Sequence, residues 1–135
     1  MTDMKAFSID IVTPDGLEFS GEAESLLVKC EEGDVEILAG HADFLAAVST
    51  GKARIRIDGK DRFAAVSGGF LTVNGGKAKL VATTFEFSED IDLDRALRAK
   101  ESAEQMLASP KGELDERIIK AKLARALSRI SAAQK

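Results

Sequence analysis

The stretch Lys52-Ala-Arg-Ile-Arg-Ile-Asp-Gly-Lys-Asp-Arg-Phe-Ala-Ala-Val66 decides the fold of the first part of the chain. From Ala53 to Asp58, apolar residues alternate with charged ones, and this period of two is typical of a strand with one buried face. Asp58-Gly59 is a residue pair favoured in two-residue hairpin turns. Apolar residues return after the turn, from Phe63 onward. The stretch therefore predicts a β-hairpin.

Similar short apolar runs, separated by turn residues, lie on both sides of this hairpin, and Asn74-Gly75 predicts a second two-residue turn. Their close spacing leaves no room for crossover helices. It therefore favours a two-sheet sandwich or a flattened barrel over a parallel sheet. About ten short strands are expected, near residues 6–12, 17–21, 25–30, 37–38, 45–48, 52–58, 63–66, 71–73, 78–82 and 85–87.

Glycine usage divides the chain, because ten of its eleven glycines precede Lys77 and only Gly112 follows. The last third is rich in good helix formers. A helix is expected to begin at Ser88 or Asp90 and to run to about residue 108, and a second to run from about 114 to 133. Residues 109–112 form the reversal between them. The predicted fold is thus α+β, with a β-sandwich or flattened barrel over 1–87 and an antiparallel two-helix hairpin over 88–135.

Alanine dominates the faces on which the two helices are expected to meet. Such seams allow close approach of the backbones, but each alanine buries little area. The hairpin should therefore be held weakly. From the residues alone, it either docks permanently on the β domain or detaches from it, and both alternatives stay open. The seam positions are Ala96, Ala99, Ala103 and Met106 on the first helix and Ile119, Leu123, Ala126, Ile130 and Ala133 on the second.

Charge is distributed unevenly within a formal net charge of −4. Residues 1–89 carry 9 Lys/Arg and 15 Asp/Glu, and residues 90–135 carry 10 and 8. Residues 117–135 hold six basic side chains and no acidic one, so the two parts are expected to meet different partners. Cys30 is the only cysteine, which excludes an intrachain disulfide. The opening residues lack the apolar region of a signal peptide, and no apolar run is long enough to span a membrane.

Residues that carry catalysis are scarce. His41 and Cys30 are the single histidine and cysteine, so neither a histidine metal cluster nor a convincing catalytic pair is expected. No glycine-rich loop leads from a strand into a helix, which excludes a P-loop or a dinucleotide fingerprint. Tyrosine and tryptophan are absent, which argues against a stacking platform for nucleic acid. We therefore expect a non-enzymatic protein with no metal site.

Three segments remain as candidate binding sites. Gly33–Phe44 is either a turn, a strand and a turn, or a contact loop that presents Asp34, Glu36 and His41 to a polar partner. Asp92 and Arg95 lie three residues apart, a spacing that favours an intrahelical salt bridge. Arg125 and Arg129 share one helix face, which is either a solvated basic face or a clamp for phosphate oxygens.

Four motifs in this order resemble the epsilon subunits of bacterial F-type ATP synthases. They are Gly33–Phe44 with its Gly40-His41, Ser67-Gly-Gly-Phe70, Ile91-Asp92-x-x-Arg95-Ala96 and Arg125-Ala-x-x-Arg129. The resemblance covers essentially the whole chain. The resemblance implies a non-catalytic subunit of the central stalk, at the cytoplasmic face of the bacterial plasma membrane. Its sandwich would pack on the gamma subunit and touch the polar loops of the c-ring through Asp34 and His41, with Glu36 beside them.

The resemblance also implies two positions of the hairpin. Folded down it lies on the sandwich, and extended it reaches the alpha/beta catalytic hexamer and blocks ATP hydrolysis. In some members ATP favours the folded-down position. The matching residues here are Glu86, Ile91, Asp92, Arg95, Ala96, Arg125 and Arg129.

Ser102 stands where ATP-binding members carry a further arginine. Losing one charge-assisted contact costs roughly 1.5–3 kcal/mol, so ATP is expected to bind weakly or not at all, and no cofactor is required. The alternative function is a stand-alone nucleotide-sensing module that binds ATP on its hairpin.

Overall fold

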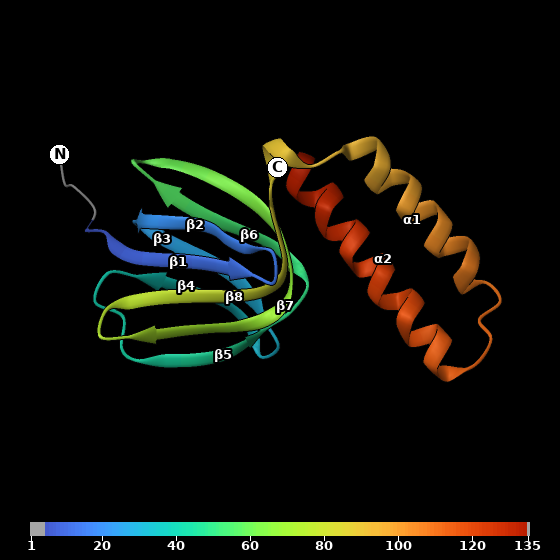
Figure 1. Ribbon diagram of the computed structural model, residues 1–135, viewed down its shortest axis with the longest axis horizontal. Coiled ribbons are helices and arrows are strands. Elements are labelled where there is room, and N and C mark those ends of the chain that lie inside the picture. Colours follow the sequence, from blue (N-terminus) through green and yellow to red (C-terminus); the bar gives the residue numbers. More distant parts are fainter. Residues whose placement is uncertain (1–4, 135) are drawn as a thin grey trace.

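The computed structural model describes residues 5–134, so Met1–Met4 and Lys135 lie outside the described residues. A β-sandwich is followed by an antiparallel helical hairpin, as predicted (Figure 1). The elements are β1 (Phe7–Thr13), β2 (Gly16–Ala23), β3 (Ser25–Cys30), β4 (Gly33–Leu38), β5 (Phe44–Val48), β6 (Gly51–Ile57), β7 (Lys60–Asn74), β8 (Lys77–Phe87), the 3₁₀ turn η1 (Ser88–Asp90), α1 (Leu93–Leu107) and α2 (Glu113–Gln134).

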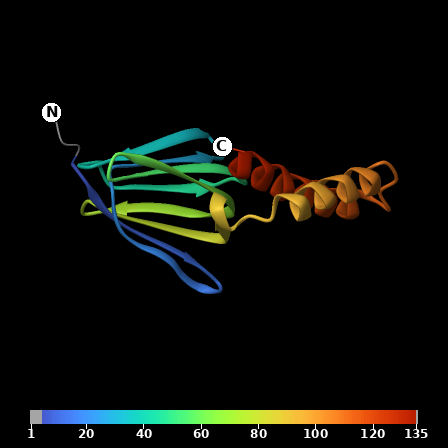
Figure 2. The same ribbon diagram turned by 90° about the horizontal axis from the view of Figure 1, so that it is seen from above.

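The strands form two layers joined through β7 and β8 (Figure 2). Hydrogen-bonded neighbours follow the order β2-β1-β8-β7-β5-β3-β4, and β6 pairs with β3 and β7. β1 and β8 are parallel, whereas the other pairs are antiparallel. Branched aliphatic side chains fill the space between the layers, where their removal from water stabilises the fold. The largest fully buried ones are Ile9, Ile11, Leu26, Val28, Ile37, Ile55, Leu71 and Leu80.

The described residues form eight strands rather than the ten expected. Segments 63–66 and 71–73 both belong to β7, and segments 78–82 and 85–87 both belong to β8. The first half of β7 pairs with β6 and the second half with β5, so β7 passes from one layer to the other. The sequence prediction was wrong here because a bend inside a strand and a turn between strands use the same residues.

Gly68 and Gly69 make this bend. Both have positive φ values, 53° and 135°, which side-chain-bearing residues rarely adopt. A Cβ on Gly69 would lie 1.8 Å from the carbonyl oxygen of Val81, so only glycine fits. The bend also reverses the alternation of side chains, because Ala64 and Val66 join the core before it and Leu71 and Val73 after it.

Both predicted two-residue hairpins are present, although one turn is shifted. Asp58-Gly59 connects β6 to β7, with positive φ at both residues, as a type I′ turn requires. Between β7 and β8, Asn74 pairs with Lys77, so the turn residues are Gly75-Gly76 rather than Asn74-Gly75.

The hairpin projects from one end of the sandwich and is seated through α2 (Figures 1 and 2). α1 packs on α2, and α2 packs on β6, β7 and η1. α1 begins two residues later than predicted from Asp90, because Asp92 is its N-cap and its carboxylate accepts the N–H of Arg95 at 3.1 Å. Ser88 and Asp90, the predicted caps, lie in η1.

Candidate functional site

The hairpin seat is the surface on which the last turns of α2 meet β6, β7 and β8. The Ser128 hydroxyl, which is buried, donates to the carbonyl oxygen of Gly51 at 2.9 Å. The Arg129 Nε donates to the Glu86 carboxylate at 2.8 Å. Ala65 is buried although it lies outside the core cluster, because α2 covers the outer side of β7. Small side chains and two polar bonds therefore make this seat.

A cavity of about 450 Å³ lies beside the seat, between the end of the sandwich and α1. Five of the seven residues implied as ATP contacts line it. Ile91 is half-buried in the link before α1, and Arg125 lines a shallow depression with Ser128 and Arg129 instead. The cavity lining comprises Thr13, Asp15, Glu18, Thr84, Phe85, Glu86, Asp90, Asp92, Arg95, Ala96, Ala99 and Arg129.

Carboxylates outnumber guanidinium groups in this lining, with five Asp/Glu against two Arg. Arg129 is already paired with Glu86, and the Asp92 carboxylate caps α1. A polyanion entering the cavity would meet like charge, which lowers its affinity. Asp15 and Glu18 were missed by sequence reasoning, because the turn between β1 and β2 reaches the hairpin only through the fold.

The predicted Asp92–Arg95 pair exists in a different form. Asp92 bonds the backbone N–H of Arg95 rather than its guanidinium, so it stabilises the helix start directly. Arg95 is exposed and lines the cavity.

Arg62 fixes the point where the chain leaves the sandwich. Its guanidinium lies 3.7 Å from the centre of the Phe87 ring and pairs with the Glu89 carboxylate. The pKa of Glu89 lies below its ordinary value, first because its carboxylate bonds its own backbone N–H and then because of Arg62. Sequence reasoning missed this contact, since 25 or more residues separate Arg62 from both partners.

The three predicted partner-contact residues do not form one loop. Residues 33–38 form β4 and a turn follows at 39–40, so about 13 Å of extended strand, from Asp34 to Leu38, lies between Asp34 and the turn before His41. Asp34 and Glu36 are exposed and point to the same side of β4. His41 follows β4 at the end remote from the helices, with its Nδ1 2.7 Å from the Ala42 oxygen.

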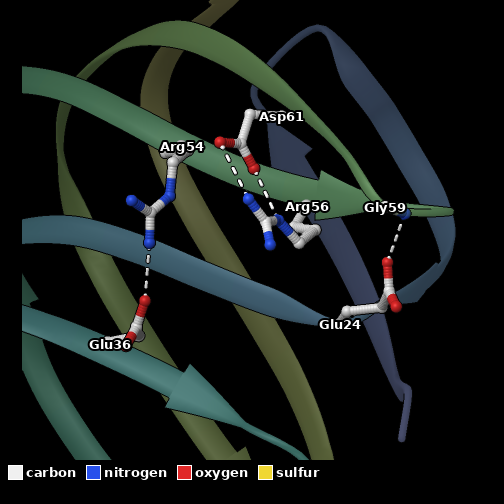
Figure 3. Close-up of polar contacts among 6 residues, drawn as sticks. All are labelled: Glu24, Glu36, Arg54, Arg56, Gly59 and Asp61. Atoms are coloured by element: carbon white, nitrogen blue, oxygen red, sulfur yellow. Dashed lines mark hydrogen bonds and ion pairs between the residues drawn. The ribbon is translucent and has the colours of Figure 1, made fainter. Parts of the chain in front are cut away.

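Charged side chains cover the outer face of β4, β3, β6 and the first half of β7, which we call the charged face (Figure 3). Arg54 pairs with Glu36 at 2.6 Å, and Arg56 forms two bonds with Asp61, the shorter at 2.8 Å. The Glu24 carboxylate accepts the N–H of Gly59 at 2.6 Å, which ties the turn between β6 and β7 to the start of β3. Opposite charges thus neutralise each other across neighbouring strands.

Apolar side chains cross the opposite outer face in one row, which we call the apolar row. Register places them side by side on five adjacent strands, β5, β7, β8, β1 and β2. Phe70 is 57% exposed, Val81 41% and Leu17 64%. Sequence reasoning missed this row because the bend at Gly68-Gly69 decides which face of β7 carries Phe70. The members in strand order are Ala47, Phe70, Val81, Val12 and Leu17.

Groups with catalytic potential are not assembled in the described part of the chain. Cys30 is buried at the end of β3, and desolvation raises the pKa of its thiol, the opposite of nucleophile activation. Within residues 5–134, no three metal-ligating side chains cluster, and no helix is long and apolar enough to cross a membrane.

The chain is thus a β-sandwich with an apolar row on one outer face and a projecting helical hairpin. The chain belongs to the ATP synthase delta/epsilon family. Residues 6–88 match the model of the delta/epsilon chain beta-sandwich domain, and residues 89–134 match that of its long alpha-helix domain. The members of this family are non-catalytic subunits of the complex.

Similar chains carry the name ATP synthase epsilon chain. The one from Ruminiclostridium cellulolyticum is 40% identical over 129 residues, covering 96% of both chains. The one from Bacillus velezensis is 39% identical over 130 residues, covering 96% of this chain and 98% of that one. The fold is also found in a chain of the Euglena gracilis mitochondrial ATP synthase, with a TM-score of 0.82 at 22% identity, covering 99% of this chain and 85% of that chain.

Proposed function

We propose that this chain is a rotor subunit that joins the gamma subunit to the c-ring and restrains ATP hydrolysis through its hairpin. The observation that carries the proposal is the apolar row. Contiguous exposed apolar surface on a small protein marks an interaction site. In a chain of this family, gamma is the partner that we assign to it, with Phe70 as the central anchor because large aromatic side chains dominate interface energetics.

The c-ring contact is assigned to Asp34, Glu36 and His41. All three reach solvent, and the first two offer carboxylates to the polar loops of a membrane ring. Glu36 is held by Arg54, so its position is fixed before a partner arrives. Through these partners the chain would sit at the cytoplasmic face of the bacterial plasma membrane without entering the bilayer.

Inhibition of hydrolysis is assigned to the hairpin in an extended position. α2 exposes Arg117, Lys120 and Lys122, and basic side chains suit acidic segments of the alpha/beta hexamer. The seat of α2 relies on small side chains, which favours release of the hairpin from the sandwich.

ATPase activity of a reconstituted alpha–beta–gamma complex tests this proposal. The full chain should lower the activity, and a chain lacking residues 90–135 should lower it much less while still binding gamma. The core cluster contains only residues of β1–β8, so the shortened chain keeps its own core. Equal activity with both chains would refute the regulatory role, and loss of gamma binding by both would refute the rotor assignment.

ATP is proposed as a weak regulatory ligand of the cavity rather than as a required cofactor. Arg95 and Arg129 supply the positive charge, and the surrounding carboxylates limit affinity. Ser102, which stands where ATP-binding members of the family carry an arginine, would limit it further. Calorimetry with millimolar ATP on the wild type and on Arg95→Ala, which removes a guanidinium that lines the cavity, tests this site. Heat that the substitution reduces would support it, whereas no heat in either protein would remove both the ligand and the alternative of a stand-alone nucleotide sensor.

A further inference from the structure

We propose that Ser128 and Arg129 form a latch that holds the hairpin on the sandwich without nucleotide. The latch consists of two bonds, from the Ser128 hydroxyl to the Gly51 carbonyl and from Arg129 to the Glu86 carboxylate. A role of this latch in regulating ATP hydrolysis rests on the proposed function, whereas the two bonds and their effect on hairpin docking do not.

The Ser128 bond connects the last turns of the hairpin directly to the backbone of the sandwich. Ser128 is buried, so losing its partner would leave a buried hydroxyl unpaired. The acceptor lies at the first residue of β6, and the Lys29 side chain packs against Gly51 from β3. The carbonyl is therefore held in place from two strands.

The bond between Arg129 and Glu86 places a carboxylate against a guanidinium for which an anionic ligand in the cavity would compete. Arg129 lines the cavity, and Glu86 occupies its Nε at 2.8 Å. Glu86 thus acts as an internal anion, which favours the docked hairpin in the absence of ligand. A phosphate group could bond to the Nε of Arg129 only by displacing this carboxylate.

Apolar burial at the seat is too small to make these bonds redundant. Small side chains are prominent at this contact: Ala65 and Ser67 of β7 line the shallow depression together with Ser128 of α2, and Ala132 of α2 is buried. Each offers a methyl group or less to the contact, whereas a large aliphatic side chain would add much more. The two latch bonds therefore contribute to the population of the docked hairpin.

Thiol labelling of the full chain carrying Ala65→Cys measures undocking. Residue 65 lies beneath α2 and is 5% exposed, so a thiol there should react only when the hairpin leaves. Cys30 lies in the core and should react only when the sandwich unfolds, so it reports global unfolding in the same sample. Ser67→Cys, under the same helix, provides a second reporter if Ala65→Cys does not fold.

Ser128→Ala should raise the labelling rate at position 65 about fivefold without nucleotide, because one net hydrogen bond is lost. Ser131→Ala is the matched control, since Ser131 is exposed on the same helix and gains the same helix propensity. Arg129→Gln and Glu86→Gln should each raise the rate about threefold, as expected for a partly exposed pair, and the double variant should add little. Arg117→Gln, which removes an exposed charge, should leave the rate unchanged.

Three results would overturn the latch: equal rates in Ser128→Ala and Ser131→Ala, an unprotected thiol at position 65 before ATP is added, or Cys30 labelling that rises in step with position 65. The same variants separate the latch from the proposed function. Faster labelling with no increase in ATPase inhibition would leave the latch standing and refute the regulatory role.

Discussion

The charged face and the apolar row lie on the same sandwich, but one exposes paired charges to solvent and the other exposes apolar side chains. On the charged face, Glu36, Arg54, Arg56 and Asp61 pair across strands and stay accessible to solvent. The apolar row leaves Phe70, Leu17 and Val81 exposed with no polar group to compensate. Charges on the first face are paired within the chain, whereas the second face leaves apolar surface in water, and this is the surface that we assign to gamma.

Gly69→Ala should have the largest effect, because the two faces are separated by the bend at Gly68-Gly69. The new Cβ would collide with the Val81 carbonyl, so we expect a loss of about 3 kcal/mol or more in the free energy of unfolding. Gly68→Ala is the matched control. Its new Cβ would lie 3.3 Å from the Thr83 hydroxyl, so we expect a loss of about 1–2 kcal/mol in the free energy of unfolding. Urea denaturation measures both, and equal losses would contradict the assigned role of Gly69.

Phe70→Asp, on the apolar row, should weaken binding to gamma but leave the stability of the chain nearly unchanged. We expect about thirtyfold weaker binding to gamma, equivalent to about 2 kcal/mol, because a central apolar anchor is lost. Since Phe70 is 57% exposed, the free energy of unfolding should change little. Arg56→Gln, on the charged face, is the control and should bind gamma normally in the same titration. Equal weakening by both substitutions would remove the distinction between the faces.

Glu89 tests whether a charge pair gains importance when it lies against an aromatic ring. Its pKa is below the ordinary value, so its contribution to stability is present at neutral pH and is lost as pH falls through the acidic range. The melting temperature should therefore drop less between pH 6 and pH 3 (ordinary glutamate pKa is about 4.3) in Glu89→Gln than in the wild type. Identical pH profiles would show that the contact with Arg62 contributes nothing.

Glu36→Gln should have the smallest effect on stability, because the pair with Arg54 is open to solvent. Exposed ion pairs contribute about 0.5 kcal/mol, and salt should reduce even this. Thermal denaturation at low and high salt measures it. A loss well above 1 kcal/mol would mean that the charged face is structural after all.

Local patterns predicted most of the fold. Alternation located the strands, Asp58-Gly59 located a turn, and the helical hairpin followed from the loss of glycine after Lys77. The division into units 1–87 and 88–135 stays a prediction. The sequence did not reveal that Gly68-Gly69 lies inside a strand, because residues 60–74 form one strand only when β6 and β5 pair with its two halves.

The candidate site was less predictable for the same reason. Arg129 and Glu86 were both implied by resemblance, but their direct bond depends on how α2 lies on β8. The apolar row was hidden: Phe70 and Leu71 point to opposite faces as neighbours in a strand do, but which of them faces outward depends on the preceding bend. The proposed contacts of Asp34, Glu36 and His41 depend on partner chains and stay predictions.

The long strand β7 connects the apolar row, the hairpin seat and the charged face within one continuous strand. Its 15 residues carry Phe70 in the apolar row, Ala65 under the hairpin and Asp61 on the charged face. A twisting force applied by a partner at Phe70 therefore reaches the hairpin seat along one covalent chain. Torque from a rotating partner would strain β7 at the hairpin seat. Rotation would then change the stability of the docked hairpin.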